Sequence, residues 1–309
     1  MLPWWPLPSF NYILYVSILA LSLPQCWKLS HVQPIPKKGS RSDPSNYRPI
    51  ALTCILSKIF ETLLNSHFLD HLESHSLLSD RQYGFRRSRS TGDILSYLTD
   101  LWFSALRNYG ETCGVALDIS KAFDRVWHAS LLSKLPSFGF PPSLCLLMSS
   151  FLSNRSISAV VDGATSSSFS VNSGVPQGSV LSPTLFLLFI NDLLVCTSNS
   201  IHSYADDSTL HSSTHFNSAP SFTSRIASRL NLSYSILADL DRISGLGRLK
   251  LVKFNSLKTQ LLQISLSKTP SNFPISFDGS LVSSVDNINI LGLNINKKNV
   301  LETSHHNGC

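Results

Sequence analysis

Two acidic sites lie on apolar, strand-like segments, and they constrain the fold more than any other feature of the sequence. Asp118 comes near the end of the apolar run 114–119, and Asp206 and Asp207 lie at the tip of a hairpin expected over residues 202–211. An unpaired carboxylate is costly in apolar surroundings. Carboxylates gathered there therefore either raise one another's pKa values or require a cation. If the hairpin packs beside the strand of Asp118, the carboxylates converge and would hold two magnesium ions, which favour oxygen ligands. The alternative is that Asp118 caps the next helix and the hairpin tip is only a polar turn.

Apolar spacing and turn residues predict an α+β fold with a mostly antiparallel sheet. Ser120 is expected to cap a helix that has Phe123 and Trp127 on its inner face. Helices are expected over residues 12–23, 50–72, 93–106, 123–135, 184–194 and 222–243. Strands are expected over 114–119, 157–162 and 169–171, in the hairpin 202–211, and within 249–264 and 275–293.

The most apolar stretch, residues 12–23, is predicted to form a buried helix. It is shorter than the roughly 20 apolar residues that span a bilayer. A signal peptide begins with positively charged residues before its apolar segment. No Lys or Arg precedes residues 12–23. A targeting or membrane-tethering role is the alternative interpretation, and a membrane partner is not expected.

Composition and charge favour a folded intracellular protein. Of the 309 residues, 43% are hydrophobic, which is enough for a core and argues against a disordered or fibrous chain. The six cysteines are scattered without a C-x-x-C pair, which indicates an intracellular chain and leaves nucleus and cytoplasm open. The net charge of +6 is compatible with a polyanionic partner. Basic residues gather in an arm over 28–48 and in a loop over 81–89 that also carries aromatic residues.

A series of short motifs, weak one by one, becomes specific through its order along the chain. ALDISKAFD at 116–124, SGVPQGSVLSP at 173–183 and YADD at 204–207 resemble motifs A, B and C of reverse transcriptases. IPKKG at 35–39, NYRPIAL at 46–52 and YGFR at 83–86 resemble the fingers motifs of these enzymes. Phe254-Asn255 with Lys258-Thr259 resembles motif D, and residues 290–292 resemble the start of motif E. The chain is similar to polymerases of non-LTR retrotransposons of the LINE-like, jockey or CR1 type.

The resemblance implies a catalytic centre with two Mg²⁺ ions, or Mn²⁺ as an alternative. The catalytic residues would be Asp118, Asp206 and Asp207, and the carbonyl of Ile119 would be a further metal ligand. Phe123 matches the position whose ring excludes a ribose 2′-hydroxyl, although a role in a helical core is also open.

The resemblance also implies binding residues for the substrates. The incoming nucleotide would contact Lys37, Lys38, Arg48, Phe123, Gln177, Gly178 and Lys258, the last as the proton donor to pyrophosphate. The template would contact Tyr83, Phe85, Arg86 and Arg87. For any one basic residue taken alone, the alternative is a solvated surface charge.

The expected protein is therefore a right-hand polymerase of the fingers–palm type, with an antiparallel palm sheet flanked by helices and a thumb that is missing or truncated. Its function would be RNA-directed DNA synthesis in retrotransposition, with an RNA template, a DNA primer and deoxynucleoside triphosphates as partners. No obligate protein partner is evident. The expected regions are an apolar segment (1–27), a fingers-type region (28–112), a palm with motifs A to D and the start of E (113–295) and an unstructured tail (296–309). The alternative is a truncated, inactive retroelement remnant that at most binds nucleic acid.

Overall fold

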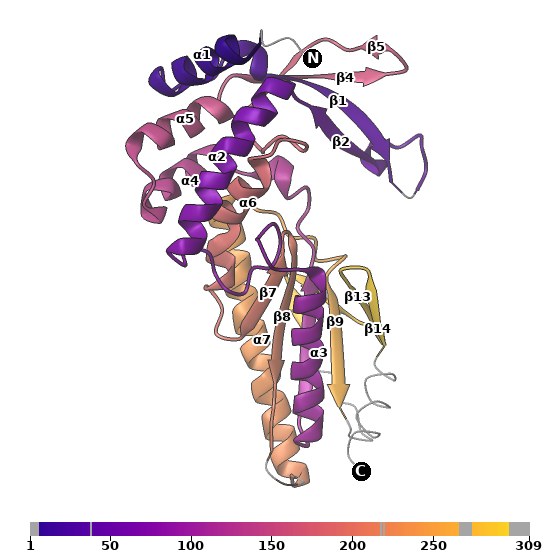
Figure 1. The fold of residues 1–309 in the computed structure, drawn as a ribbon. Helices are drawn as coiled ribbons and strands as arrows, with labels where there is room; N and C mark the ends of the chain where they lie inside the picture. The colour runs from indigo at the N-terminus through magenta and orange to yellow at the C-terminus, as the bar shows by residue number, and fades with distance from the viewer. Residues whose placement is uncertain (1–5, 38, 217, 219, 266–273, 297–309) are drawn as a thin grey trace. The chain divides into compact units, whose positions relative to one another are not determined.

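A computed structural model describes residues 6–37, 39–216, 218, 220–265 and 274–296, and the chain divides into two compact units (Figure 1). Unit 1 comprises residues 1–78 and 123–189, and unit 2 comprises residues 79–122 and 190–309. Each unit is therefore built from two separate stretches of chain. The division into fingers, palm and tail proposed from the motifs is a division of function, and it stays a prediction.

Unit 1 combines a small mixed sheet with five helices. The sheet has the order β2-β1-β4-β5, and β6 also pairs with β4. The pairing of β1 with β4 is parallel, and the other pairs are antiparallel. The strands are β1 (Leu29–Pro36), β2 (Tyr47–Leu52), β4 (Arg155–Val161), β5 (Ala164–Thr165) and β6 (Phe169–Val171). The helices are α1 (Pro6–Leu19), α2 (Ile55–Ser74), α4 (His128–Lys134), α5 (Pro142–Leu152) and α6 (Ser182–Ile190), with short 3₁₀ turns at Gln25–Trp27, Pro44–Asn46, Phe123–Arg125 and Leu135–Phe138.

The first two helices differ from expectation in what they bury. The helix expected at residues 12–23 forms as α1, but its burial was predicted wrongly because Tyr12, Tyr15 and Leu19 are mostly exposed. The helix expected over 50–72 begins only at Ile55, since residues 50–52 pair with β1. The described part of the chain contains no helix with both the length and the apolar composition to cross a bilayer.

The apolar residues of α2 that predicted the helix by their spacing, Ile55, Ile59, Leu63 and Phe68, do not all face inward, since only Phe68 is buried. Ile55, whose side chain is 75% exposed, lies on the outer face together with Ile59 and Leu63. Ser57 and Glu61 are fully buried on the inner face. The 3.6-residue spacing thus identified the helix correctly, but it predicted the wrong packing side for the first half of α2.

The single helix expected over 123–135 is broken into a 3₁₀ turn at Phe123–Arg125 and α4, and Ser120 does not cap it. The cause is a loop of unit 1 that takes the backbone acceptors. The amide of Val175 donates to the carbonyl of Phe123 at 2.8 Å, and the amide of Gly174 donates to that of Val126 at 2.9 Å. Because a continuous helix needs those carbonyls for its own i to i+4 bonds, it cannot form there. Trp127 is consequently exposed, contrary to prediction.

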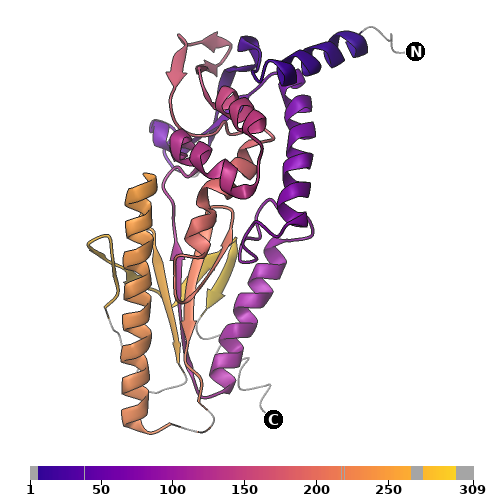
Figure 2. The ribbon, with the colours of Figure 1, turned by 90° about the vertical axis from the view of Figure 1, so that its left-hand side faces the viewer.

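Unit 2 is a five-stranded sheet with a long helix on each face (Figure 2). The strand order is β12-β9-β3-β8-β7, and only the β12–β9 pair is parallel, which confirms the mostly antiparallel prediction. The strands of unit 2 are β3 (Glu111–Leu117), β7 (Ser200–Tyr204), β8 (Asp207–Ser213), β9 (Gln260–Ser265), β10 (Ser276–Phe277), β11 (Ser280–Leu281), β12 (Ser283–Ser284), β13 (Asn287–Ile290) and β14 (Leu293–Asn296). Its helices are α3 (Thr91–Arg107) and α7 (Phe222–Lys250), with a 3₁₀ turn at Asn191–Leu194.

Helix α3 begins at Thr91, two residues before the predicted start, and packs on the core of unit 2. The Ser90 side chain accepts from the Asp93 amide while the Asp93 carboxylate accepts from the Ser90 amide, so both ends of a capping box are present. Farther along, Trp102 and Leu106 join a buried cluster with residues of β9, β13 and β14: Leu262, Ile264, Ile288, Ile290 and Ile295. This cluster holds the β13–β14 hairpin against the sheet.

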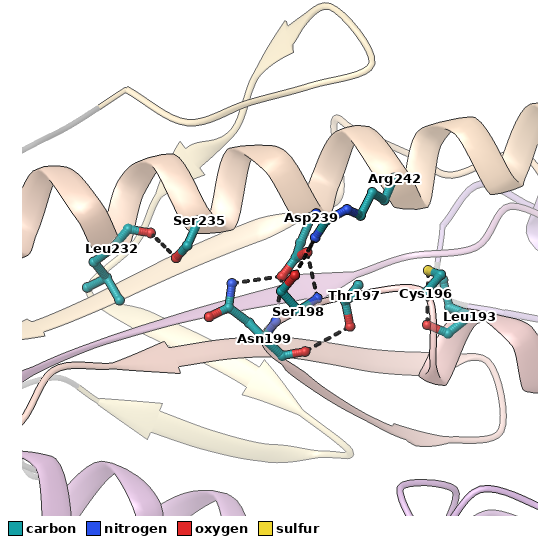
Figure 3. A network of polar contacts seen from close by, with 9 residues as sticks. All are labelled: Leu193, Cys196, Thr197, Ser198, Asn199, Leu232, Ser235, Asp239 and Arg242. Atoms are coloured by element: carbon teal, nitrogen blue, oxygen red, sulfur yellow. Dashed lines mark hydrogen bonds and ion pairs between the residues drawn. The ribbon is translucent and has the colours of Figure 1, made fainter.

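A polar network ties α7 to the loop before β7 (Figure 3). The buried carboxylate of Asp239 accepts from the amides of Ser198 at 2.8 Å and Asn199 at 2.7 Å. The side chain of Asn199 and the guanidinium of Arg242 also donate to it. Although burial opposes ionisation, these donors lower the pKa of Asp239, so the carboxylate is charged at neutral pH. The network fixes the entry of the chain into β7.

Candidate active site

The three predicted catalytic carboxylates all lie in unit 2, at one end of its sheet. Leu117, the last residue of β3, pairs with Ser208 of β8. Asp118 follows Leu117 and Asp207 precedes Ser208, so both acids lie directly beyond the last pair of this ladder, and Asp206 precedes Asp207 in the turn after β7. Burial is the main cause that raises the pKa of Asp207, followed by the charges of Asp206 and Asp118. The carboxylates are thus close enough to interact, as the sequence predicted.

Asp118 and Ile119 are held from the other side by the segment predicted as motif D. The amide of Asn255 donates to the Asp118 carbonyl, and the amide of Ser120 donates to the Lys253 carbonyl, both at 2.8 Å. Ile119 forms an isolated antiparallel bridge with Phe254 and is buried. Lys258 is exposed, and its amide donates to the Asn255 carbonyl at 3.1 Å. The chain therefore brings Lys258 to the end of the sheet where the carboxylates lie.

The donor chemistry of this site fits divalent cations that prefer oxygen. Within the described residues, no group of three or more His, Cys, Asp or Glu side chains is gathered as a ready-made metal cage. Mg²⁺ does not need such a cage, because it keeps several waters and is usually bound by one or two carboxylates together with substrate phosphates. Burial, and next the charges of Asp206 and Asp118, raise the pKa of Asp207, and a bound cation would stabilise the charged carboxylates.

A cavity of about 210 Å³ lies beside Asp207 in unit 2. Its walls come from β3, from Asp207 to Thr209 of β8, and from Asn289 to Gly292 of the β13–β14 hairpin. The sequence predicted only the start of motif E here, but residues 287–296 form a complete antiparallel hairpin. Leu291 and Gly292 both have positive φ angles, as a tight two-residue hairpin turn requires.

The predicted template residues follow Gln82 in unit 2 and differ in their exposure. The Tyr83 ring is half-buried, 6.2 Å from the His202 ring and under the guanidinium of Arg89. Phe85 and Arg87 are exposed. Arg86 is buried and donates to the carbonyls of Ser79 at 2.7 Å and Gln82 at 3.3 Å. Its guanidinium therefore holds the loop together, a role that the basic composition of the loop did not reveal.

The predicted nucleotide residues other than Lys258 belong to unit 1, and Lys38 lies outside the described residues. Lys37 and Arg48 are exposed, and Arg48 belongs to β2. Gln177 is joined to the same strand, because the Ala51 amide donates to its carbonyl at 2.6 Å. Gly178 has a φ of 122°, and a Cβ there would lie 2.5 Å from the Ala51 carbonyl oxygen. A glycine is thus required at position 178 because the backbone there passes close to β2.

Phe123 and Gln177 have side-chain partners within unit 1. The ring of Phe123 stacks on that of Phe186 with centroids 4.8 Å apart, and it is half-buried. The amide nitrogen of Gln177 donates to a carboxylate oxygen of Asp124 at 2.8 Å. Both Asp124 and Gln177 line a cavity of about 270 Å³ whose walls include β1, β2 and β4. One face of the Phe123 ring therefore packs in the core. This arrangement is compatible with both roles that the sequence left open, exclusion of a ribose 2′-hydroxyl and core packing.

Glu61 of α2 is a buried acid that the sequence analysis missed. Its carboxylate accepts from the hydroxyls of Ser57 and Ser179 and from the amides of Val180, at 2.8 Å, and Leu181, at 3.3 Å. Ser179, Val180 and Leu181 directly precede α6, and a negative charge is favourable near the N-terminus of a helix. Glu61 thus fixes the loop that carries Gln177 and Gly178. An acid next to the apolar residues Ile59 and Phe60 was the only signal in the sequence.

The comparisons with known proteins agree with this geometry. Residues 35–295 match the family described as reverse transcriptase (RNA-dependent DNA polymerase). The RNA-directed DNA polymerase from mobile element jockey of Drosophila melanogaster is 36% identical over 209 residues, which are 64% of this chain and 23% of that protein. The probable RNA-directed DNA polymerase from transposon BS of the same species is 35% identical over 59% of this chain and 20% of its own length. The chain thus spans less than a quarter of these relatives.

Solved structures show the same fold. The apo telomerase of Candida tropicalis truncated from its C-terminal domain matches 93% of this chain and 57% of its own, with a TM-score of 0.56 and 12% identity. The telomerase of Candida albicans with a fragment of telomeric RNA gives a TM-score of 0.52 over 93% of this chain and 48% of its own, at 13% identity. This likeness confirms the predicted α+β fold of the fingers–palm type. Since the family match covers most of the sequence, the chain belongs to the reverse transcriptase (RNA-dependent DNA polymerase) family.

Proposed function

We propose that this chain carries out RNA-directed DNA synthesis in retrotransposition, adding deoxynucleotides to a DNA 3′-hydroxyl on an RNA template. The observation that carries the proposal is that Asp118 and Asp207 both lie directly beyond the Leu117–Ser208 pair of β3 and β8 in a member of this family. In the reaction, the 3′-oxygen loses its proton and bonds to the α-phosphorus, and the bond from that phosphorus to the bridging oxygen breaks. Pyrophosphate is the leaving group.

Asp118, Asp206, Asp207 and the carbonyl of Ile119 would hold two Mg²⁺ ions, or Mn²⁺ in their place. When bound, such ions supply Lewis acidity to the attacking and leaving oxygens of a phosphoryl transfer. The pKa of Asp207 is raised by burial and, to a lesser extent, by the charges of Asp206 and Asp118, and this supports the role because a cation would stabilise the charged carboxylate against both causes.

The remaining predicted residues would orient the substrates. Lys37, Lys38 and Arg48 would neutralise the triphosphate, and Lys258 would give a proton to the leaving pyrophosphate. Gln177 and Gly178 would lie against the incoming nucleotide. Phe123 would exclude a ribose 2′-hydroxyl, a role supported by the stacking on Phe186 that fixes its ring.

Template binding would depend on charge and stacking more than on base identity. Tyr83, Phe85 and Arg87, with Arg86 supporting the loop, would contact the RNA strand. Because the template is copied by base pairing, the affinity should fall with salt and vary little with sequence. An intracellular site of action is part of the same proposal.

Primer extension on poly-rA with oligo-dT and Mg²⁺ tests the proposal. Asp206→Ala should abolish incorporation, because one of the three carboxylates is lost, while salt-sensitive template binding is retained. Asp241→Ala, which removes an exposed acid from α7 in the same unit, is the matched control and should leave incorporation unchanged. Incorporation that survives in Asp206→Ala would remove the metal role of the hairpin tip. No incorporation by the wild-type chain, with binding intact, would favour the inactive-remnant alternative.

A further inference from the structure

The segment 81–84 lies along the outer edge of β7, next to the turn that carries Asp206. The amide of Tyr83 donates to the Ser203 carbonyl at 2.8 Å, and the amide of Ser203 donates to the Arg81 carbonyl at 2.9 Å. These bonds form a short parallel bridge between Gln82 and Ser203. Since β7 is the last strand in the sheet order, the segment covers its edge near the carboxylates.

The side chain of Gln82 reaches from this segment into the turn. Gln82 is only 1% exposed, and its Oε1 accepts from the amides of Ala205 at 3.0 Å and Gly84 at 2.9 Å. Ala205 is buried, and its amide lies beyond Tyr204–Asp207, the last pair of the β7–β8 ladder. A buried amide without an acceptor is costly. Gln82 therefore supplies the acceptor that the hairpin ladder does not.

The turn needs this support because its backbone is strained. Ala205 has a φ of 59°, in the left-handed region that residues with a Cβ rarely adopt. Such a conformation persists only where the surroundings determine it. Gly84 belongs to the same contact, since a Cβ there would lie 2.3 Å from the Ala205 nitrogen.

We propose that Gln82 is a positioning residue that fixes the turn at Ala205 and so the placement of Asp206 and Asp207 beside Asp118. The inference rests on the proposed function of these carboxylates. Asp206 follows Ala205 directly, so a rotation of the Ala205 amide away from Gln82 moves the backbone that carries the acids. Because Gln82 is almost fully buried, it acts through the turn.

Hydrogen exchange on the full chain tests the contact without reference to activity. Gln82→Met removes the acceptor at nearly constant volume, and Gln263→Met, a half-buried position on β9 of the same unit, is the matched control. The Ala205 amide should exchange on the order of tenfold faster in Gln82→Met and not in the control, since local opening sets exchange. The amides of α3 and β9 should keep their protection.

Steady-state primer extension then tests the consequence. Gln82→Met should lower kcat by roughly tenfold to a hundredfold, as misplaced catalytic groups do, with the KM for the nucleotide nearly unchanged. Gly84→Ala should produce the same two effects, because its Cβ displaces the Ala205 amide. If Gln82→Met does not fold, Gly84→Ala still tests whether displacement of the Ala205 amide speeds its exchange and lowers kcat.

Three outcomes would overturn the inference. Unchanged exchange at Ala205 would mean that Gln82 does not hold the turn. Loss of protection throughout unit 2 would mean a general role in stability, and faster exchange with an unchanged kcat would mean that the turn conformation does not affect catalysis. If the wild-type chain itself incorporates nothing, the proposed function fails, while the exchange of Ala205 still decides whether Gln82 holds the turn.

Discussion

A buried pair of histidines beneath the β7–β8 hairpin should make the stability of unit 2 fall in mild acid. Nδ1 of His202 and Nε2 of His211 are 3.0 Å apart, and the two side chains are 5% and 6% exposed. The ring of Tyr97 lies 4.6 Å from that of His202. Burial, and next the neighbouring His211 and Arg81, lower the pKa of His202 to about 3. Burial and Arg81 lower the pKa of His211 to about 4.

The direction of the effect follows from these lowered pKa values. Below the ordinary pKa of 6.5, the unfolded chain binds protons at both positions while the folded chain does not. The stability that the neutral pair contributes is therefore fully present above about pH 6.5 and is lost as the pH falls toward about 4. From about pH 7.5 to about pH 5.5, each histidine should cost roughly 1.4 kcal/mol of unfolding free energy, so the pair should cost about 3 kcal/mol.

Urea unfolding followed by circular dichroism at a series of pH values measures this loss. Other groups also titrate in this range, so the informative quantity is the difference between the wild-type chain and the double variant His202→Gln/His211→Gln. That difference should change by about 3 kcal/mol over the two pH units. His67→Gln, at an exposed position, is the control and should follow the wild-type chain. A double variant whose stability varies with pH as the wild type does would refute the argument.

Two further substitutions test unit 1. Glu61→Ala should lower the unfolding free energy by about 3 kcal/mol, because it leaves the buried amides of Val180 and Leu181 without their acceptor; a loss below about 1 kcal/mol in urea unfolding would contradict the role assigned to Glu61. Phe123→Val should reduce discrimination against ribonucleotides by about tenfold, measured as the ratio of kcat/KM for deoxy- and ribonucleotides. Phe169→Val, at an exposed position of β6, should leave that ratio unchanged, and an unchanged ratio in Phe123→Val would reduce Phe123 to a core residue.

The sequence predicted well the features that depend on neighbouring residues. The helix predicted over 93–106 forms as α3 over 91–107, with a start that the local capping box of Ser90 and Asp93 fixes. The apolar residues after Pro183 predicted a buried helix, and Leu185 to Ile190 are buried in α6. The hairpin with two acids at its tip was likewise predicted from residues that adjoin each other, and β7 and β8 form it.

Predictions failed where distant segments compete for the same backbone groups or cover the same face. The helix expected over 123–135 is broken because Gly174 and Val175, far along the chain, bond to its carbonyls. The outward position of Ile55 on α2 has the same kind of cause, since the inner face is committed to Glu61 and its partners around Ser179. Neither contact produces a periodic pattern of residues in the sequence.

By itself, the sequence identified the family through the order of its motifs, and it predicted that three carboxylates on apolar strands carry the chemistry. Only the tertiary structure decided that Asp118 and Asp207 lie beyond the same strand pair, that Glu61 holds the loop of Gln177, and that Gln82 supports Ala205. The physical reason is separation along the chain. Glu61 and Val180 are 119 positions apart, and Gln82 and Ala205 are 123 apart, so their hydrogen bonds exist only after the sheets and helices have packed.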